Sequence, residues 1–304
     1  MTTRPFVLAL AVASFAALAG AHTPQQTRPS SSFPALNVDA ITKALGRPGQ
    51  MTGDVYKVSF PRTDLDVSVG GVWVRPALAL GSWAAFRAGA NGAAADGDLV
   101  LTEGEVNPVI SALQQGGFEI TALHNHLLHE VPRVMYVHFW GRGDGTTLAR
   151  GLRNALSRTK TPLAAAATPA TQPAPGFDAA KIQRAIGLKG TVNGGVLSLS
   201  RARPEPVAMM GVELPPSMGM ATSINIQDAG GGTIAATGDF VLTGDEVNLV
   251  AAALRTHGID VTALHNHMIH GSPELYFMHF WAHDTPDRVA AGLKAALDRT
   301  AGAR

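Results

Sequence analysis

The sequence predicts an α+β fold built from two tandem homologous domains, each a mainly antiparallel sheet with helices packed on one face. The first observation is an internal repeat, because residues 41–160 align with residues 182–301. The match is strongest where GDLVLTEGEVN corresponds to GDFVLTGDEVN and TALHNHLLHEVP corresponds to TALHNHMIHGSP. The second observation is the order of patterns in each copy, in which glycine-bounded β-rich segments, an amphipathic helix, two strand-like runs and a final helix follow one another.

The first elements of each copy are a short helix and then strands. An amphipathic run predicts the helix at residues 39–45 and, in the second copy, at 180–186. The segments VYKVSF (55–60) and DLDVSVGGVWV (64–74) are rich in β-branched and aromatic residues. Such segments are typical of strands in an antiparallel sheet.

The later elements of each copy begin with a capping-box signal. Thr102 precedes Glu105 by three residues, apolar residues follow on one helical face, and Gly116 ends the helix. The pair Thr243 and Glu246 repeats this spacing. Two strand-like runs follow at 118–128 and 133–140. The last helix has apolar residues on its buried face, namely Leu148, Leu152, Ala155 and Leu156.

The segments outside the copies predict export. A positive charge at Arg4, an apolar stretch at 6–19 and the sequence Ala-Gly-Ala predict that residues 1–21 are a cleaved secretory signal. Residues 22–35 are expected to form a disordered tail, and the Ala/Pro-rich segment 161–176 an extended linker. The repeat domains are then residues 36–160 and 177–304. We expect a periplasmic or secreted protein without a membrane anchor after signal cleavage.

Composition excludes several classes of function. Lys and Arg number 24 and Asp and Glu number 23, so there is no basic field and no nucleic-acid partner is expected. The chain has no cysteine, which excludes disulfides, thiol nucleophiles and cysteine-ligated metals. Any metal must therefore be held by His, Asp, Glu or backbone oxygen. The composition leaves the oligomeric state open.

Eight of the 11 histidines stand at positions that are histidine in both copies. His124 and His126 are two positions apart on a predicted strand, so they share one face, and a hairpin near Val131 would set His138 opposite His124. Three imidazoles suit zinc first, with copper, nickel or iron as alternatives, and leave one coordination position open. The predicted ligands are His124, His126 and His138 in one copy and His265, His267 and His279 in the other. Additional candidates are His129, Glu130 and His270.

Acidic residues near these histidines have structural explanations beside functional ones. Glu105 and Glu246 are candidate general bases for a metal-bound water, although a capping box also explains them. Asp98 and Asp239 each follow a glycine and are expected in turns. Asn125 and Asn266 alternate with the flanking histidines, so they should point the opposite way and bind backbone groups or the neighbouring helix, not a metal.

The histidine motif shares features with two known families. His124-x-His126-x3-Glu130 matches the first metal motif of cupins, but Gly271 replaces the glutamate in the second copy and the rest of the cupin pattern is missing, so a cupin is not expected. The two copies of TALHNH…HFW, each preceded by GDxVLTxxEVN, resemble the LppY/LpqO family of exported bacterial proteins over nearly all of residues 36–300. This resemblance implies export and carries no established activity.

Three functions fit the pattern. The first is an exported transition-metal-binding protein that buffers, delivers or senses the metal without turnover. The second is a metal-dependent hydrolase in which an open-coordinate ion generates hydroxide. The third is a module that binds a small-molecule ligand without metal. Because no complete set of nucleophile, base and orienting group is visible, metal binding is predicted first.

Overall fold

The computed structural model describes residues 35–89, 92–164 and 173–301. The predicted signal at 1–21, all but the last residue of the predicted tail, and residues 165–172 of the predicted linker lie outside these ranges. Both sequence repeats fall within one compact unit, residues 33–304. None of the helices in the described ranges is long and apolar enough to cross a membrane.

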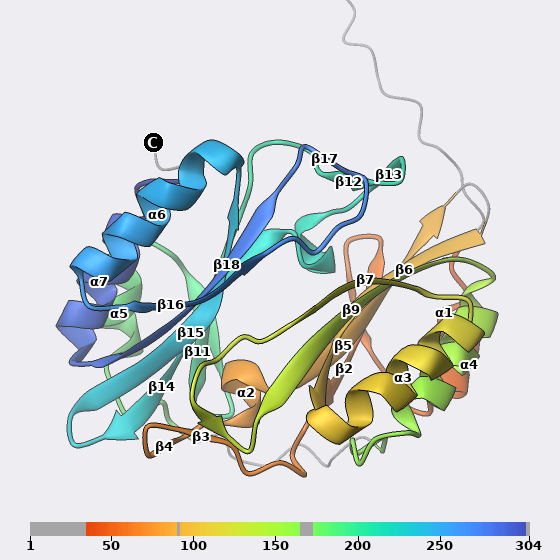
Figure 1. The fold of residues 1–304 in the computed structure, drawn as a ribbon, viewed down its shortest axis with the longest axis horizontal. Coiled ribbons are helices and arrows are strands. Elements are labelled where there is room, and N and C mark those ends of the chain that lie inside the picture. Colours follow the sequence, from red (N-terminus) through yellow and green to blue (C-terminus); the bar gives the residue numbers. More distant parts are fainter. Residues whose placement is uncertain (1–34, 90–91, 165–172, 302–304) are drawn as a thin grey trace, which may run out of the picture. The chain divides into compact units, whose positions relative to one another are not determined.

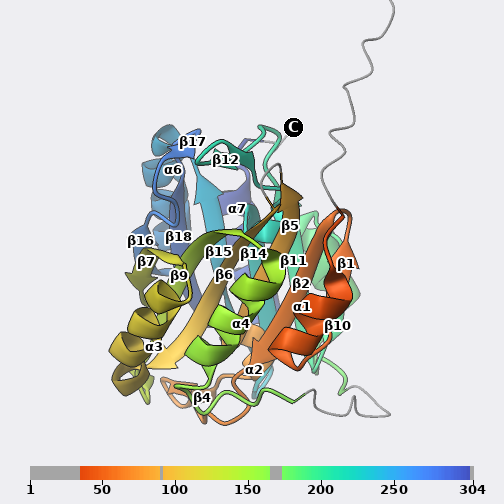
Figure 2. The same ribbon diagram turned by 90° about the vertical axis from the view of Figure 1, so that its right-hand side faces the viewer.

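Repeat 1 forms a six-stranded antiparallel sheet in the order β1-β2-β5-β6-β9-β7 (Figure 1). Three helices cover one face of this sheet (Figure 2). The strands are β1 (Gln50–Thr52), β2 (Val55–Pro61), β5 (Gly81–Gly89), β6 (Gly92–Thr102), β7 (Glu119–His124) and β9 (Val134–Gly143). The helices are α1 (Val38–Leu45), α3 (Glu103–Gln115) and α4 (Gly145–Leu156).

Repeat 2 forms the same architecture, with the sheet order β10-β11-β14-β15-β18-β16. The strands are β10 (Gly190–Asn193), β11 (Val196–Ala202), β14 (Ala221–Gly230), β15 (Thr233–Leu242), β16 (Asp260–His265) and β18 (Tyr276–Asp284). The helices are α5 (Ala179–Ile186), α6 (Gly244–Thr256) and α7 (Pro286–Leu297). The predicted α+β class, with a mainly antiparallel sheet and helices in each repeat, is confirmed.

The helices are held on their sheets by the apolar stripes that the sequence shows. In repeat 1, Leu113 of α3 and Leu152 of α4 are fully buried in one cluster with Phe86 and Phe139 of the strands. Burial of each such side chain contributes about 1.5–3 kcal/mol relative to exposure. The alternate residues of the same strands point to the opposite face of the sheet, which carries no helix of its own repeat.

The segment 64–74, predicted to contribute strands of an antiparallel sheet, forms two short strands that pair antiparallel in a separate small sheet and not in the six-stranded sheet. Gly70 and Gly71 have φ of 57° and 86°, and this left-handed pair turns the chain between β3 (Ser68–Val69) and β4 (Val72–Trp73). A short helix follows, α2 (Pro76–Ala79). In repeat 2 the equivalent elements are β12 (Ala208–Met209), β13 (Val212–Glu213) and the 3₁₀-helix η1 (Pro216–Met218).

We call residues 67–80 strap 1 and residues 207–220 strap 2. Each strap forms a small three-stranded sheet with a short strand of its own repeat, β8 (Glu130–Val131) for strap 1 and β17 (Gly271–Ser272) for strap 2. Each strap also packs on the sheet of the other repeat. Strap 1 shares an apolar cluster with Trp281, and strap 2 shares one with Trp140. Because each strap covers the sheet of the other repeat, the sheet faces that carry no helices are buried.

Strand register corrects the alignment of the two repeats in one region. Lys57 and Ser198 are equivalent, and so are Asp98 and Asp239, which matches the sequence alignment. Between them, however, Trp83 faces Asp98 while Ser223 faces Asp239, so the strap and the following strand are displaced by one residue. The ungapped alignment is therefore wrong for this segment, and Trp83 corresponds to Ser223.

Candidate metal centre between the repeats

The six histidines predicted as ligands converge in one cluster rather than in two separate sites. The ring centroids of His124 and His265 lie 3.6 Å apart. Two further pairs across the repeats are equally close, with His126 and His279 at 3.8 Å and His138 and His267 at 3.8 Å. We call this group the histidine cluster: His124, His126, His138, His265, His267 and His279. Its members come from both repeats in equal number.

Strand ends and loops position the rings. His138 lies in β9 and His279 in β18, while His124 and His265 are the last residues of β7 and β16. The prediction of one strand through 118–128 is wrong, because β7 ends at His124 and His126 lies in the loop. The predicted register is also shifted, since His138 pairs with Ala122 beside a bulge. The centroids of His124 and His138 nevertheless lie 5.1 Å apart.

Aromatic rings fix the two loop histidines. The ring of His126 stacks on Tyr136 with centroids 3.3 Å apart, and His267 stacks on Phe277 at 3.6 Å. Tyr136 is itself anchored, because its hydroxyl donates to the Ala79 carbonyl at 2.9 Å. The two aromatic residues hold equivalent positions in β9 and β18, so both repeats support their loop histidine in the same way.

Backbone carbonyls define which ring nitrogen faces the cluster. The Nδ1 atoms of three histidines lie 3.3, 3.2 and 2.9 Å from carbonyl oxygens, in the pairs His124–Asn125, His265–Phe277 and His279–Gly238. A carbonyl only accepts, so each Nδ1–H donates and the lone pair of each neutral ring is on Nε2. Metal-ligating histidines are oriented by the same kind of hydrogen bond.

Several Nε2 atoms of the histidine cluster lack a hydrogen-bond partner. Nε2 is buried without a hydrogen bond in four residues of the cluster: His124, His126, His138 and His279. Leaving a buried polar group unpaired costs about 1–3 kcal/mol. Donor atoms lie within 4.8 Å of one another in two overlapping groups of the described residues. These are His124, His126 and His138, and His124, His265, His267 and His279.

Burial keeps the rings uncharged. It lowers the pKa of His124 to about 3, with repulsion from His265 adding to the effect, and lowers the pKa of His265 to about 4. The pKa values of the other four lie well below the ordinary 6.5, because burial and then the neighbouring imidazoles disfavour a positive charge. Neutral imidazole is the form that binds a metal ion.

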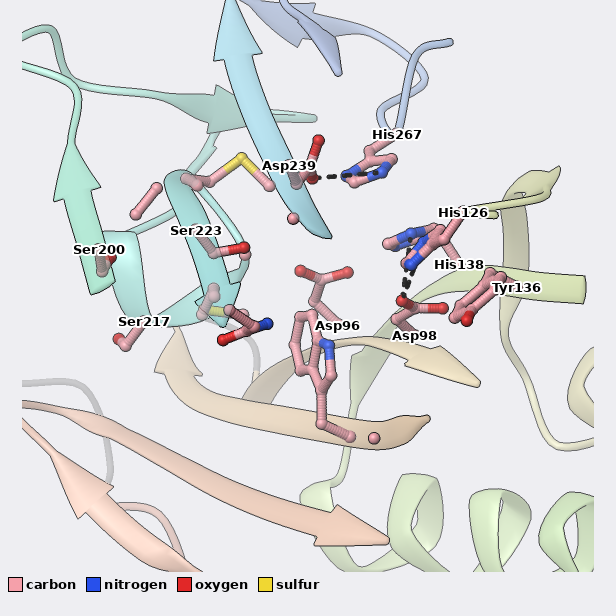
Figure 3. A pocket seen from close by; sticks show the side chains of 18 of the residues that line it. Asp96, Asp98, His126, Tyr136, His138, Ser200, Ser217, Ser223, Asp239 and His267 are labelled. Atoms are coloured by element: carbon pink, nitrogen blue, oxygen red, sulfur yellow. Dashed lines mark ion pairs between the residues drawn. The ribbon is translucent and has the colours of Figure 1, made fainter. Parts of the chain in front are cut away.

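Asp98 and Asp239 belong to the same site, and their prediction as turn residues is wrong. They lie within β6 and β15, directly opposite His138 and His279. One oxygen of Asp98 lies 3.7 Å from Nε2 of both His126 and His138. Asp239 lies 4.0 Å from His267 and 3.9 Å from His279. Figure 3 shows both carboxylates directed at the imidazoles.

The glycine before each aspartate explains the error. A Cβ on Gly97 would collide with the ring of Phe139, and one on Gly238 would collide with the Ser223 carbonyl. Glycine is therefore needed for close packing inside a strand, although Gly-Asp reads as a turn signal in the sequence. The signal that would have identified these residues is the pairing of the two strands, which sets the aspartate of each Gly-Asp pair opposite the histidine of the neighbouring strand.

Glu105 and Glu246, the candidate general bases, lie at the starts of α3 and α6 and not in the histidine cluster. Glu105 accepts from the Thr102 amide at 2.9 Å and pairs with Arg62 at 2.8 Å. Burial alone would raise the pKa of Glu105, but Arg62 and the cap hold it below its usual value. Glu246 makes the equivalent bonds to Thr243 and Arg203. The structure gives both residues a role in capping and ion pairing.

The additional candidates also lie outside the two donor groups. His129 and His270 are exposed and adopt φ of 62° and 58°. Glu130 is buried, and both of its carboxylate oxygens lack a hydrogen-bond partner. The interpretation of Asn125 and Asn266 as backbone-binding residues is confirmed, because Asn125 donates to the carbonyls of Leu127 and Thr262 and Asn266 accepts from the Met268 amide.

A cavity of about 440 Å³ adjoins the histidine cluster. His126, His138, His267 and His279 form part of its wall together with Asp98 and Asp239, and residues of both straps complete it. The lining residues that the sequence does not point to include Lys57, Trp83 and Asp96. Burial lowers the pKa of Lys57 to about 8 and raises that of Asp96 to about 8. The repeat gave no signal for them, because Ser198, Ser223 and Thr237 hold the equivalent positions.

Comparison with known proteins gives a family and no activity. No curated protein matches the sequence. Among solved structures, the crystal structure of a trimeric bacterial microcompartment shell protein PduB is similar over 83% of this chain and 88% of that chain, with 13% identity and a TM-score of 0.21. A likeness at this TM-score carries no argument about fold or function. The family described as Domain of Unknown Function (DUF1259) matches residues 39–158 and again residues 180–299. The chain therefore belongs to this family and contains two tandem copies of its domain.

Proposed function

We propose that this protein binds a transition-metal ion in the histidine cluster. The observation that carries the proposal is the set of buried Nε2 atoms without a hydrogen-bond partner in His124, His126, His138 and His279. The rings are neutral, and those of His124 and His279 are oriented through Nδ1, so the Nε2 lone pairs of these two rings are available to an ion. A bound ion would satisfy atoms that otherwise destabilise the fold.

The donor set supports a borderline divalent cation. Imidazole nitrogen suits zinc, copper, nickel and iron, and the nearby carboxylates of Asp98 and Asp239 add oxygen donors. We propose zinc first, because its sites commonly combine histidine and carboxylate ligands. Copper, nickel and iron are the alternatives that metal analysis would distinguish.

The proposed role is metal buffering, delivery or sensing outside the cytoplasm. The predicted signal at residues 1–21 and the resemblance of the repeats to the exported LppY/LpqO family support this location. The cavity beside the cluster supports metal exchange, because it gives an ion an approach to the cluster from the space between the straps.

The test is metal uptake by the mature protein, purified without an affinity tag. Metal-free protein is incubated with zinc, copper, nickel or iron and desalted, and its metal content is measured by elemental analysis. Two double variants are compared with it, His124→Ala/His126→Ala in repeat 1 and His265→Ala/His267→Ala in repeat 2. Because the rings of the two repeats interlock, we expect either double variant to lose more than half of the bound metal.

Two results would contradict the proposal. Absence of stoichiometric metal in the wild type would overturn metal binding. Loss of half the metal in each double variant would show two independent sites and overturn the shared centre. The matched control is His257→Ala, because His257 lies at the end of α6, is exposed and is not part of the histidine cluster. This variant should retain the full metal content.

A metal-dependent hydrolase is the second candidate function, and the cavity is the observation that favours it. An ion held by the wall of the cavity would have room for water and a substrate. Glu105 and Glu246 do not line this cavity, so an enzyme of this kind would need its base among the lining residues. Hydrolysis of chromogenic phosphate or carboxylate esters that rises with metal content would favour the enzyme. No turnover with any such ester would favour the binding protein.

A further inference from the structure

We propose that the cavity beside the histidine cluster binds a small hydroxylated organic carboxylate, and that Lys57 binds its carboxylate group. The inference deepens the proposed function and rests on it for one end of the site, where the bound ion would lie beside Asp98 and Asp239. Its own basis is the other end, where repeat 1 places a cation that repeat 2 lacks.

Among the described residues that line this cavity, Lys57 is the only lysine or arginine. It is half-buried in β2, and its Nζ lies 3.8 Å from the centroid of the Trp83 ring. The ammonium donates to the Ser217 carbonyl at 3.3 Å, which ties it to strap 2. Among the described residues, no carboxylate lies within 4 Å of it. A cation held by an aromatic face and one carbonyl retains capacity for an anion.

Three carboxylates share the cavity and determine where an anion can bind. Asp98 and Asp239 are directed at the imidazoles, so these two carboxyl groups lie at the histidine cluster (Figure 3). Asp96 lies in the same cross-strand row as Lys57, with Ala85 between them, and is beyond ion-pair distance. Lys57 is therefore the position in the cavity at which a ligand carboxylate meets a positive charge.

The wall that repeat 2 contributes includes uncharged polar side chains beside the apolar residues of strap 2. It includes the hydroxyls of Ser200 and Ser223 and the amide of Asn225. Asn225 already donates to the Leu78 carbonyl, while its oxygen remains an acceptor. Hydroxyl groups of a ligand match this wall, because each can donate and accept. A volume of about 440 Å³ lies within the range of small-molecule sites.

The test compares two probes that differ in one group, D-gluconate and D-sorbitol, in which a neutral alcohol replaces the carboxylate. Binding is measured by titration calorimetry on metal-free and metal-loaded protein, with metal content checked afterwards. We expect gluconate to bind at least about tenfold more tightly than sorbitol, because a charge-assisted hydrogen bond contributes at least that factor. Equal affinity for the two probes, or no gluconate binding, would overturn the proposal.

The variant arm uses Lys57→Met with Lys189→Met as the matched control, since Lys189 is exposed and does not line the cavity. Lys57→Met should weaken gluconate binding at least about tenfold and leave metal content unchanged, while Lys57→Arg restores part of the affinity. Unchanged gluconate affinity in Lys57→Met would overturn the proposal. If that variant does not fold, the comparison of the two probes on wild-type protein decides the outcome.

The two proposals fail in different ways. Metal uptake without preference for gluconate would leave the proposed function standing and overturn the inference about the carboxylate. Lys57-dependent gluconate binding by a protein that takes up no metal would overturn the metal site and support the carboxylate end of the cavity.

Discussion

His124 and His265 hold equivalent positions at the ends of β7 and β16, and their ring centroids lie 3.6 Å apart. Contact between equivalent residues places them beside the axis that relates the two repeats. The donor group that contains His265, His267 and His279 also includes His124 of the other repeat. Duplication has therefore produced one cluster of two overlapping donor groups, of which one lies wholly in repeat 1 and the other draws on both repeats.

Metal removal should destabilise the protein. A ligand that binds only the folded state adds about 2.7 kcal/mol at a free concentration one hundred times its dissociation constant. We expect the melting temperature to rise with added metal and to fall with a chelator, as measured by calorimetry. His124→Ala and His265→Ala should each reduce this shift. A full shift in either variant would contradict a shared centre.

Asp98→Asn and Asp239→Asn should weaken metal binding by similar factors. Each carboxylate lies 3.7–4.0 Å from two imidazole Nε2 atoms of its own repeat, so it either binds the ion or orients the rings that do. Loss of such a partner typically costs 10–100-fold in affinity. Competition with a chromogenic chelator measures the change. Asp144→Asn, at the exposed start of α4, is the control and should leave the affinity unchanged.

Much of the fold was predictable because its signals are local. The capping boxes at Thr102 and Thr243 and the apolar stripes that follow predict α3 and α6 closely. The straps were not predictable, because their apolar residues are buried against the other repeat. The pattern of 64–74 predicts strands, but it does not show that Gly70 and Gly71 turn the chain and that the two strands lie outside the six-stranded sheet.

The histidines of the site were predictable, but their shared environment was not. Repetition identified His124, His126 and His138 with their counterparts, since local pattern and duplication agree. The convergence of the two sets depends on packing between the repeats, which no local pattern encodes. Lys57 was missed for a related reason, because it has no equivalent in the second copy and duplication gives it no signal.

Asn125→Ala should lower both stability and metal affinity, and Asn266→Ala should have the smaller effect. Asn125 donates to the Thr262 carbonyl of the other repeat at 3.0 Å, and Thr262 donates in turn to the His126 carbonyl at 2.6 Å. The bond that Asn266 makes, to the Met268 amide, stays within its own loop. Loss of the bond between repeats should cost about 1 kcal/mol in urea unfolding. Equal effects of the two substitutions would show that this bond does not hold the repeats together.

Glu105→Gln should destabilise the fold at neutral pH without reducing metal content. Glu105 pairs with the fully buried Arg62, and loss of its charge leaves that guanidinium with Asp64 as its remaining carboxylate partner. We expect a loss of about 2 kcal/mol in the free energy of unfolding. The pKa of Glu105 in the folded protein is below its ordinary 4.5, so the carboxyl group binds fewer protons in the folded than in the unfolded protein. Its contribution is complete above that ordinary value and is lost as the pH falls through the folded pKa. The difference between wild type and variant, measured by urea unfolding of metal-free protein, should therefore shrink below about pH 4.5. Loss of metal content or of metal-dependent turnover at unchanged stability would instead show that Glu105 acts in the chemistry of the site.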